Sequence, residues 1–584
     1  MQLRRLVRRH EVGFIGLAAS VGALAGLGVA GLLWCTELLH LWLFGHRQLS
    51  SLVALDSPIQ ALVPLMGGLI LGISGFYVQK WMPKRPVDPI EANALQGGRM
   101  SLKESALIAV QTVISNGFGA SVGLEAAYTQ VGSGVASSLG MAFRLRRGDM
   151  RTLVACGSAG AISAAFGAPL TGTFYAFELI LGTYTPFVLA PVGAAAVCGV
   201  LFSKAFGASG EFMQQMVLNS ALSDTDMGLL LLLGIICALF GIRLMKAVSS
   251  IEKLCGRIGL PRTFQPALGG LIVGVLALVT PQVLSSGHTG LSELFGPSAA
   301  PSDVILITLL LKATASAVSL GTGFRGGLFF ASLFIGGLIG QSFFFGVEYF
   351  NPSLPPDIFV CTLVGMAALA VAIIGTPMAM SFLALETTGS FPLGLVMLAV
   401  ASIVSIIVRR TFGYSFATWR LHLRGESIRS AQDVGWMRDL TVGRLMRTDV
   451  PKARLAMTIG EFIKDFPALS TNQWVVVTSE SGGYAGMVFV PDVHLAGLHE
   501  DTGAAAGLSK FSRSPDVFLL PQMNIKLAMN NFEQNENEAL AVVDNEKERH
   551  VIGLLTEAHV LRRYTDELDK ARRELSGEEW VGDS

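Results

Sequence analysis

Charged residues are scarce in this sequence. Asp, Glu, Lys and Arg make up 15% of its 584 residues, whereas hydrophobic residues make up 51%. A soluble domain carries about 25% charged residues, so this composition excludes an ordinary soluble protein and indicates a membrane protein. The formal net charge is +0, and without a basic excess the chain offers no case for nucleic acid as a partner.

Cysteine is also rare, and no metal-ligand pattern accompanies it. The 6 cysteines are scattered, mostly in apolar runs, without a CxxC pair. We expect them to be small buried side chains and expect no metal centre. The histidines lack metal-ligand spacing too, and the apolar segments hold no serine, paired aspartate or histidine constellation of an intramembrane hydrolase. The sequence therefore predicts neither an enzyme nor a required cofactor.

We expect no cleaved signal peptide. Met1–His10 carries four arginines and one histidine, but the apolar stretch behind it is too long for the hydrophobic region of a signal. The positive-inside rule then places this end of the chain in the cytoplasm. We expect a multi-pass protein of a bacterial inner (plasma) membrane.

The sequence contains long apolar runs with few charged residues. A helix needs about 20 such residues to span the hydrocarbon core of a bilayer. Runs with few or no charges occupy residues 12–44, 59–79, 187–206, 227–247, 266–282, 303–320, 327–347 and 391–408. Other apolar segments are short and broken by glycine or proline, at 115–140, 157–182 and 321–335. Such breaks predict interrupted or re-entrant helices packed inside the protein.

An internal duplication links these broken segments. Gly157–Leu179 aligns with Gly365–Thr387 at a constant offset of 208, with eight identical residues. Upstream of each, Gly117–Gly132 aligns with Gly321–Gly336 at an offset of 204, with six identical residues. Two matches in the same order predict a membrane part made of two homologous halves, roughly 12–206 and 225–412.

Paired broken segments in duplicated transporters indicate a substrate site near the midplane of the bilayer. A bare anion in hydrocarbon is strongly disfavoured, whereas backbone N–H groups and helix N-termini can replace its water without a full counter-charge. Glycines let the backbone approach closely. The duplicated breaks therefore predict a site for a small anion.

Several motifs carry a resemblance to a known family. A GxEGP element is matched by Gly123–Ala127, and a GxFxP element by Gly327–Ala331. The pattern AFxAPLxGxxFxxE is matched by Ala165–Glu178 and by its repeat partner Ile374–Glu386. At these residues the sequence resembles the CLC family of chloride channels and chloride/proton exchangers, over about residues 12–424.

This resemblance implies an all-α polytopic membrane domain over residues 1–424, with an inverted repeat, broken helices and one anion pathway in each subunit of a homodimer. It implies that the protein lies in the lipid bilayer and that chloride is its default substrate. Nitrate, bromide and fluoride remain possible substrates. Voltage- or pH-dependent transport is expected, and protons are the expected second substrate if the protein is an exchanger.

Glu125 falls on the gating glutamate of the family. A carboxylate beside a helix N-terminus mimics the permeant anion, and its protonation lets the side chain leave the site. Such an ionisable residue within an apolar segment favours a functional role over simple stabilisation of a helix start. The same resemblance assigns anion binding to the neighbouring backbone at Gly123, Leu124, Gly327, Leu328 and Phe329.

The sequence departs from the family at several positions. Pro86 stands where a GSGIP element supplies a serine, and Ala417 stands at the position of a family tyrosine, although Tyr414 and Ser415 lie near. If both hydroxyls are absent, the central site depends on backbone N–H groups, and its affinity for anions and its preference among them change.

Arg325 replaces a proline of the family pattern. Its side chain either attracts anions, holds a carboxylate or reaches to water.

The inner side of the pathway also differs. Exchangers of the family use an inner glutamate directly after the position of Glu178, and here that residue is Leu179. Glu178 can serve as the proton carrier in its place, or it and Glu386 are structural residues at equivalent helix ends. Channel and proton-coupled exchanger therefore both remain open.

Beyond about residue 413 charges become frequent and no run could span a bilayer. Residues 439–497 and 514–565 each read as a lead strand (LTVGRLM in the first), a helix, two strands and a final helix, with a charged tail at 566–584. Both resemble CBS modules, cytoplasmic α/β units that often follow CLC membrane domains. A non-transporting CLC-like sensor that signals through this pair is the alternative function.

CBS pairs commonly bind adenosine nucleotides at a Gly-x-x-Thr/Ser-x-x-Asp junction. The second module keeps only part of this pattern at Gly553, Thr556 and His559, and the first keeps Gly486 and Asp492. A mechanical or dimerising role therefore stays open beside nucleotide binding.

Overall fold

The computed structural model describes residues 10–47, 49, 52, 54–81, 86–207, 224–295, 301–352, 356–413, 415–416, 418–419, 441–467, 474–480, 482–498, 507–535 and 537–576. The chain divides into two compact units, Met1–Asp433 and Val434–Ser584.

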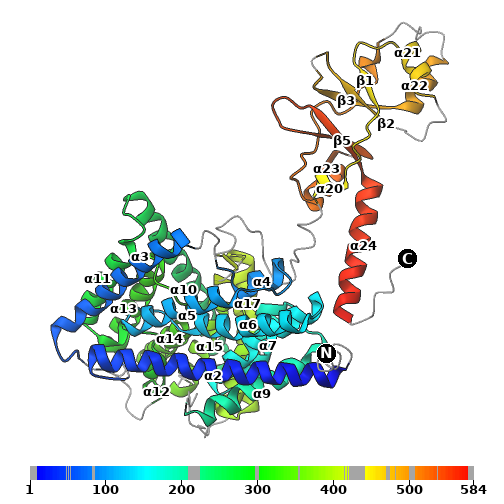
Figure 1. The fold of residues 1–584 in the computed structure, drawn as a ribbon. Helices are drawn as coiled ribbons and strands as arrows, with labels where there is room; N and C mark the ends of the chain where they lie inside the picture. Colours follow the sequence, from blue (N-terminus) through cyan, green and yellow to red (C-terminus); the bar gives the residue numbers. More distant parts are fainter. Residues whose placement is uncertain are drawn as a thin grey trace. The chain divides into compact units, whose positions relative to one another are not determined.

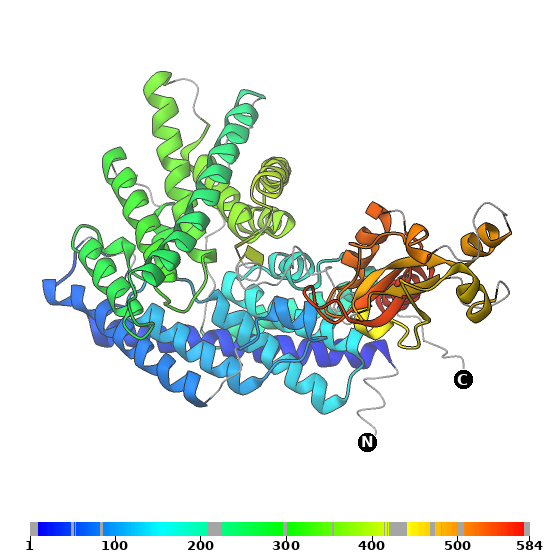
Figure 2. The same cartoon turned by 90° about the horizontal axis from the view of Figure 1, so that it is seen from above.

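The described part of the first unit is built from helices, packed side by side at varied tilts (Figures 1 and 2). In chain order the elements are α2 (Glu11–Phe44), η1 (Pro58–Leu62), α3 (Val63–Trp81), α4 (Pro89–Leu95), α5 (Leu102–Gly117), α6 (Glu125–Phe143), α7 (Arg147–Phe166), α8 (Pro169–Tyr175), η2 (Ala176–Leu181), α9 (Pro186–Ala205), α10 (Asp224–Arg257), α11 (Gln265–Ala277), η3 (Pro281–Val283), α12 (His288–Glu293), α13 (Ser302–Gly321), α14 (Phe329–Phe350), α15 (Ile358–Ile374), α16 (Pro377–Thr388) and α17 (Phe391–Thr411).

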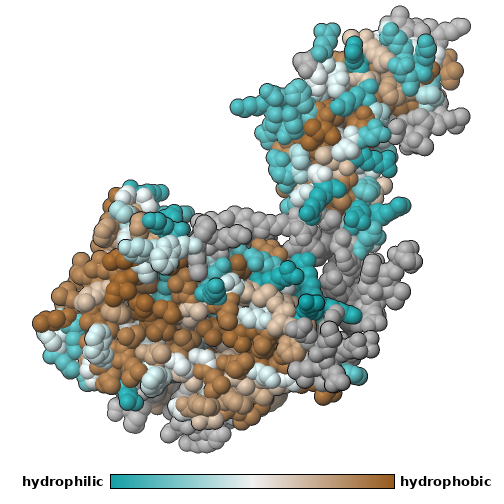
Figure 3. Space-filling view, viewed as in Figure 1, coloured by the Kyte–Doolittle hydropathy of each residue, from teal (hydrophilic) through white to brown (hydrophobic). Residues whose placement is uncertain are grey.

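The surface of this unit is apolar over most of the face drawn in Figure 3. Within the described residues, 7 helices are long and apolar enough to cross a bilayer. Large apolar side chains on them point outward, among them Trp42, which is 79% exposed, and Phe391, which is 66% exposed. Such a surface is unfavourable in water and suits lipid, so this is a multi-pass integral membrane protein.

The apolar run at 266–282 does not form a full span. The helix there, α11, has 13 residues and ends at Ala277, and the 3-10 turn η3 follows at Pro281. Pro281 has no N–H to continue a helix, so the run divides at this point. The expectation of a long helix over the whole run was therefore wrong.

Glycine and proline explain the breaks in the other apolar segments. α7 ends at Gly167 and α15 at Gly375, both in the left-handed conformation, with φ of 66° and 84°. Two residues later, Pro169 and Pro377 begin α8 and α16. A left-handed glycine closes a helix and a proline at the first position opens the next, which confirms the predicted interruption.

The duplication is visible in the packing. α6 crosses α7 with Gly132 against Gly157, and α14 crosses α15 with Gly336 against Gly365, so close that a Cβ on any of these glycines would overlap backbone. Gly132 and Gly336 are repeat partners at the offset of 204, and Gly157 and Gly365 are repeat partners at the offset of 208. Small residues at both crossings let the backbones touch, as in other membrane helix pairs. The two halves are therefore structural repeats.

The second unit is an α/β body with its own apolar cores. Its elements are α20 (Val442–Leu445), β1 (Lys452–Arg454), α21 (Ile459–Asp465), β2 (Trp474–Thr478), β3 (Tyr484–Phe489), α22 (Val490–Gly497), η4 (Leu508–Lys510), α23 (Ile525–Asn535), β4 (Ala539–Val543), β5 (Val551–Thr556) and α24 (Glu557–Ser576). β1 pairs parallel with β2, β2 pairs antiparallel with β3, and β4 pairs antiparallel with β5.

One expectation for this unit was wrong. The segment LTVGRLM contains the short helix α20, and the lead strand of the first half is β1, further along the chain. The charged segment at 566–584 begins within α24, which continues to Ser576. A lead strand of the second half is present only as a single parallel bridge between Leu519 and Val542.

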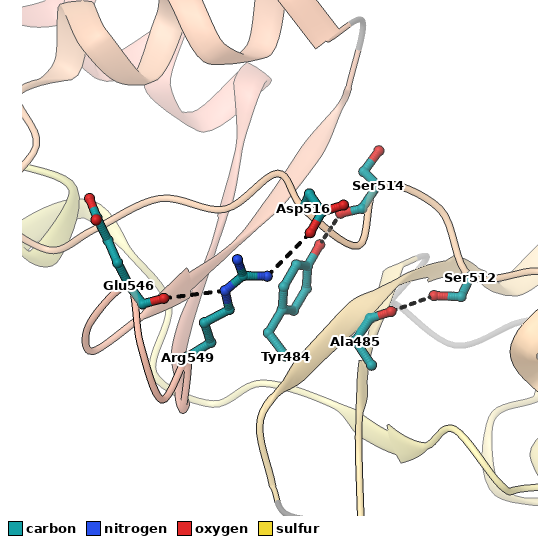
Figure 4. A network of polar contacts seen from close by, with 7 residues as sticks. All are labelled: Tyr484, Ala485, Ser512, Ser514, Asp516, Glu546 and Arg549. Carbon is teal, nitrogen blue, oxygen red and sulfur yellow. Dashed lines mark hydrogen bonds and ion pairs between the residues drawn. The ribbon is translucent and has the colours of Figure 1, made fainter.

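Polar contacts join the two halves of the second unit (Figure 4). The Tyr484 hydroxyl donates to Ser514 O at 2.9 Å. The backbone oxygen of Arg549 accepts from Tyr484 N at 2.9 Å. Within the second half, the Arg549 guanidinium donates to Asp516 Oδ1 at 3.3 Å and lies 4.9 Å from the ring centroid of Phe518.

Tyr484→Phe is expected to lower the free energy of unfolding of the second unit by about 1 kcal/mol, because Ser514 O loses a half-buried donor. Proteolysis of the full chain under increasing urea measures this. Thr565→Val is the control, since its hydroxyl bonds only to Leu561 O within α24 and its removal should change stability by less than about 0.5 kcal/mol. Equal effects of the two variants would contradict the expectation.

Candidate functional site

The N-termini of two repeat-related helices meet at the centre of the first unit. α6 begins at Glu125 and α14 at Phe329, which are partners at the offset of 204. In the breaks before them, Gly123 N donates to Gly327 O at 2.9 Å, and Gly327 N donates to Gly123 O at 3.1 Å. A cavity of about 200 Å³ opens beside this contact, lined by Glu125, Gly327, Leu328 and Phe329.

Glu125 reaches from one half of the protein to the other. Its side chain is buried, and Oε1 accepts a hydrogen bond of 2.5 Å from the backbone N–H of Phe329. Oε2 is buried and has no hydrogen-bond partner among the described residues. The first N–H groups of a helix have no partner within that helix. The carboxylate therefore occupies a place where the backbone of α14 is ready to receive an anion.

The two glycines leave the room that the carboxylate fills. A Cβ built on Gly123 would overlap Oε2 of Glu125, and a Cβ on Gly327 would overlap Oε1. Any side chain at either position would therefore displace the carboxylate. Leu124 lies on the other side, where its side chain is buried and lines a smaller cavity with Tyr128 and His40.

The residues at the N-terminus of α4 offer few hydrogen-bond donors to the cavity. Pro86 and Pro89 line it without a backbone N–H. Asp88 also lines it, and its carboxylate caps α4 by accepting from Ile90 N at 2.8 Å. The helix N-terminus at this wall is therefore already occupied by a carboxylate. Ala417 and Tyr414 lie outside the described residues.

Arg325 lies on the same cavity. Its backbone N–H donates to Ser115 Oγ at 2.9 Å, which anchors the break before α14 to α5. It is one of the residues that line the cavity with Glu125, a position that fits both attraction of an anion and contact with a carboxylate.

Glu178 and Glu386 cap helices of opposite halves. Glu178 Oε1 accepts from Met378 N at 2.9 Å and Oε2 from Ala379 N at 3.1 Å, in the first turn of α16. In return, Glu386 accepts from Leu170 N and Thr171 N at 2.7 and 2.9 Å, in the first turn of α8. The two carboxylates therefore make equivalent contacts in the two repeats. Neither residue is among those that line the cavity.

A family profile described as "Voltage gated chloride channel" matches residues 67–410, more than half of the chain. A ClcB-like chloride channel protein of Ralstonia nicotianae is 30% identical over 386 residues, which cover 65% of this chain and 89% of that protein.

This chain belongs to the CLC family.

The "Voltage-gated ClC-type chloride channel ClcB" of Escherichia coli O81 is also 30% identical, over 402 residues that cover 68% of this chain and 95% of that one. Among solved structures, a slow cyanobacterial Cl⁻/H⁺ antiporter superposes with a TM-score of 0.61 at 18% identity, over 70% of this chain and 97% of its own. A eukaryotic CLC transporter gives 0.58 at 16% identity, over 93% and 97%. The fold is that of CLC transporters.

Tyr175 is among the cavity residues that reasoning from the sequence missed. Tyr175 ends α8 and lines the cavity, where its ring stacks parallel to that of Phe329 at 6.0 Å. The sequence carried a signal for it, because the CLC pattern AFxAPLxGxxFxxE has phenylalanine at this position. Immediately after it, the π-helical turn η2 begins, and Leu179 and Ile180 from this turn also line the cavity. Such turns are frequent at functional sites.

Glu178→Gln and Glu386→Gln are each expected to lower the free energy of unfolding by about 1–2 kcal/mol, because an amide replaces a charged helix cap. Thermal unfolding in detergent measures this, and each variant is the repeat-related control of the other. Proton flux should change equally little in both. A loss of proton coupling in Glu178→Gln alone would instead identify Glu178 as the proton carrier.

Proposed function

We propose that this protein carries chloride or a similar small anion across the membrane, with Glu125 as its gate. One observation carries the proposal: the carboxylate of Glu125 lies in the glycine-lined space between Gly123 and Gly327, bonded to the N-terminus of α14. A negative group held by backbone N–H at a helix start stands where a permeant anion would bind.

Competition between the carboxylate and the anion provides the gate. While Glu125 is ionised, its bond to Phe329 N–H keeps the anion from the same donor. Protonation on the unpartnered Oε2 removes the charge and weakens that bond, so the side chain leaves and an anion enters. One residue thereby links proton occupancy to anion occupancy, which makes transport depend on pH.

The inner side of the pathway decides between a channel and an exchanger. Leu179 stands at the position of the family's inner glutamate, and the neighbouring Glu178 is held by the backbone of α16. Coupled exchange through the usual inner carboxylate is therefore disfavoured. An uncoupled channel, or an exchanger with another inner proton route, fits these residues better.

We further propose that the protein is a homodimer in a bacterial inner membrane, with its second unit in the cytoplasm. The bacterial relatives support the location. The second unit repeats the order of helix, two strands and helix in each half, as expected of a CBS pair. Its nucleotide pattern is incomplete at Gly553, Thr556 and His559, so a dimerising role is the proposal for this pair.

Chloride efflux from liposomes containing the purified protein tests the function. Wild-type protein should release chloride faster than empty liposomes do, when a potassium ionophore balances the charge. The reversal potential under a pH gradient then separates the mechanisms: a shift with pH at fixed chloride indicates coupled exchange, and no shift indicates a channel. Absence of flux from both wild type and Glu125→Ala would contradict transport and favour the CLC-like sensor.

A further inference from the structure

Arg325 aside, few of the residues that line the cavity beside Glu125 have side-chain donors that an anion could use. Thr112 and Thr129 line it, but their hydroxyls donate to the backbone oxygens of Ile108 and Glu125, at 2.8 and 3.0 Å. The amide of Gln130 donates to Val87 O at 2.9 Å. These three donors are therefore committed to the protein itself.

Tyr175 differs from these residues. Its hydroxyl makes no hydrogen bond to the described part of the chain, and yet the side chain is only 6% exposed and lines the cavity. Its oxygen is not among the fully buried polar atoms of the described residues that lack a partner, so the hydroxyl opens onto the cavity and can donate a hydrogen bond there. A ligand in the cavity could accept a hydrogen bond from this hydroxyl.

The ring of Tyr175 is held in place by its neighbours. It lies parallel to the ring of Phe329, with an interplanar angle of 5°. Phe166 packs on the other residues of this aromatic cluster, with ring centroids 4.9 Å from Phe329 and 4.6 Å from Phe330. The hydroxyl is therefore presented from a rigid wall, next to the residue whose N–H binds Glu125.

We propose that the hydroxyl of Tyr175 donates a hydrogen bond to the transported anion in this cavity. This inference rests on the proposed anion transport. It explains how the site retains a hydroxyl donor although Pro86 replaces the family's serine, since Tyr175 adds a hydroxyl where the family pattern has phenylalanine. The tyrosine is a binding residue, and Glu125 remains the gate.

Tyr175→Phe tests the proposal, because it removes the hydroxyl and keeps the stacked ring. The half-saturating chloride concentration for efflux should rise about tenfold, as should the chloride dissociation constant measured by titration calorimetry on the purified protein. Maximal flux at saturating chloride should change little. Thr112→Val is the matched control: it removes a hydroxyl from the same cavity, but one that is bonded to its own helix, and should leave both constants within about twofold.

Each outcome is decisive. A raised half-saturation in Tyr175→Phe with an unchanged Thr112→Val supports the proposal. Wild-type chloride flux together with an unchanged affinity in Tyr175→Phe overturns it and leaves the transport function standing. An equal loss of affinity in both variants also overturns it, because any change of the wall would then suffice. Wild-type protein without chloride flux or chloride binding overturns the proposed function and this inference together.

Discussion

Glu125→Gln is expected to abolish the pH dependence of chloride flux. The glutamine keeps the size of the side chain, but it cannot ionise and it imitates the protonated carboxyl. An amide is a weaker partner than a carboxylate for the N–H of Phe329, so the side chain no longer competes effectively with the anion. Flux should then stay constant within about twofold between about pH 5 and pH 8, because no titrating group is left at the gate.

Efflux from liposomes at a series of external pH values measures this effect, and any proton flux driven by chloride should be lost in the same variant. Glu104→Gln is the matched control, since Glu104 also lies in the first turn of a helix, α5, but away from the cavity. A Glu125→Gln variant with the pH profile of the wild type would show that the gate lies elsewhere.

Lys312→Met is expected to cause the largest loss of stability. Lys312 lies on α13 and is completely buried. Its ammonium donates to the backbone oxygens of Val283, Leu284 and Ser285 at 3.2, 3.2 and 2.9 Å. An ammonium has three donors, and all are matched here. Methionine fills the space but leaves three buried carbonyls without this partner, so the free energy of unfolding should fall by about 3–5 kcal/mol.

The consequence should extend to the gate. Ser285 Oγ donates to Asn116 Oδ1 at 2.9 Å, and Asn116 Nδ2 donates to Val122 O at 2.6 Å, directly before Gly123. The lysine thus supports the loop that holds the break in front of α6. Intramembrane cations of this kind are normally retained for such internal contacts or for function.

Thermal unfolding in detergent, followed by the fraction of monodisperse protein that remains, measures the effect of Lys312→Met. Lys253→Met on α10 is the control, because that lysine is exposed and should change stability by less than about 0.5 kcal/mol. Unchanged thermal stability in Lys312→Met would mean that water or other donors satisfy the three carbonyls.

Much of the fold follows from the sequence because its signals are local. Apolar runs give the spans, and glycine followed by X-Pro, as at Gly167 and Pro169, gives the break between two helices. The prediction of a long helix over residues 266–282 was wrong because hydropathy does not distinguish a full helix from a shorter one that ends before Pro281. The lead strand of the second unit was misplaced because strands of three residues, such as β1, carry little periodic signal.

The site divides in the same way. The sequence by itself determined that this is a duplicated membrane protein with an acidic residue, Glu125, in a glycine-rich break, because hydropathy, repeats and motifs are read along the chain. Only the tertiary structure decided that Glu178 caps α16 and that Tyr175 lines the cavity beside Glu125. These contacts join segments that are distant in the chain, and helix packing rather than local sequence decides which donor meets which acceptor.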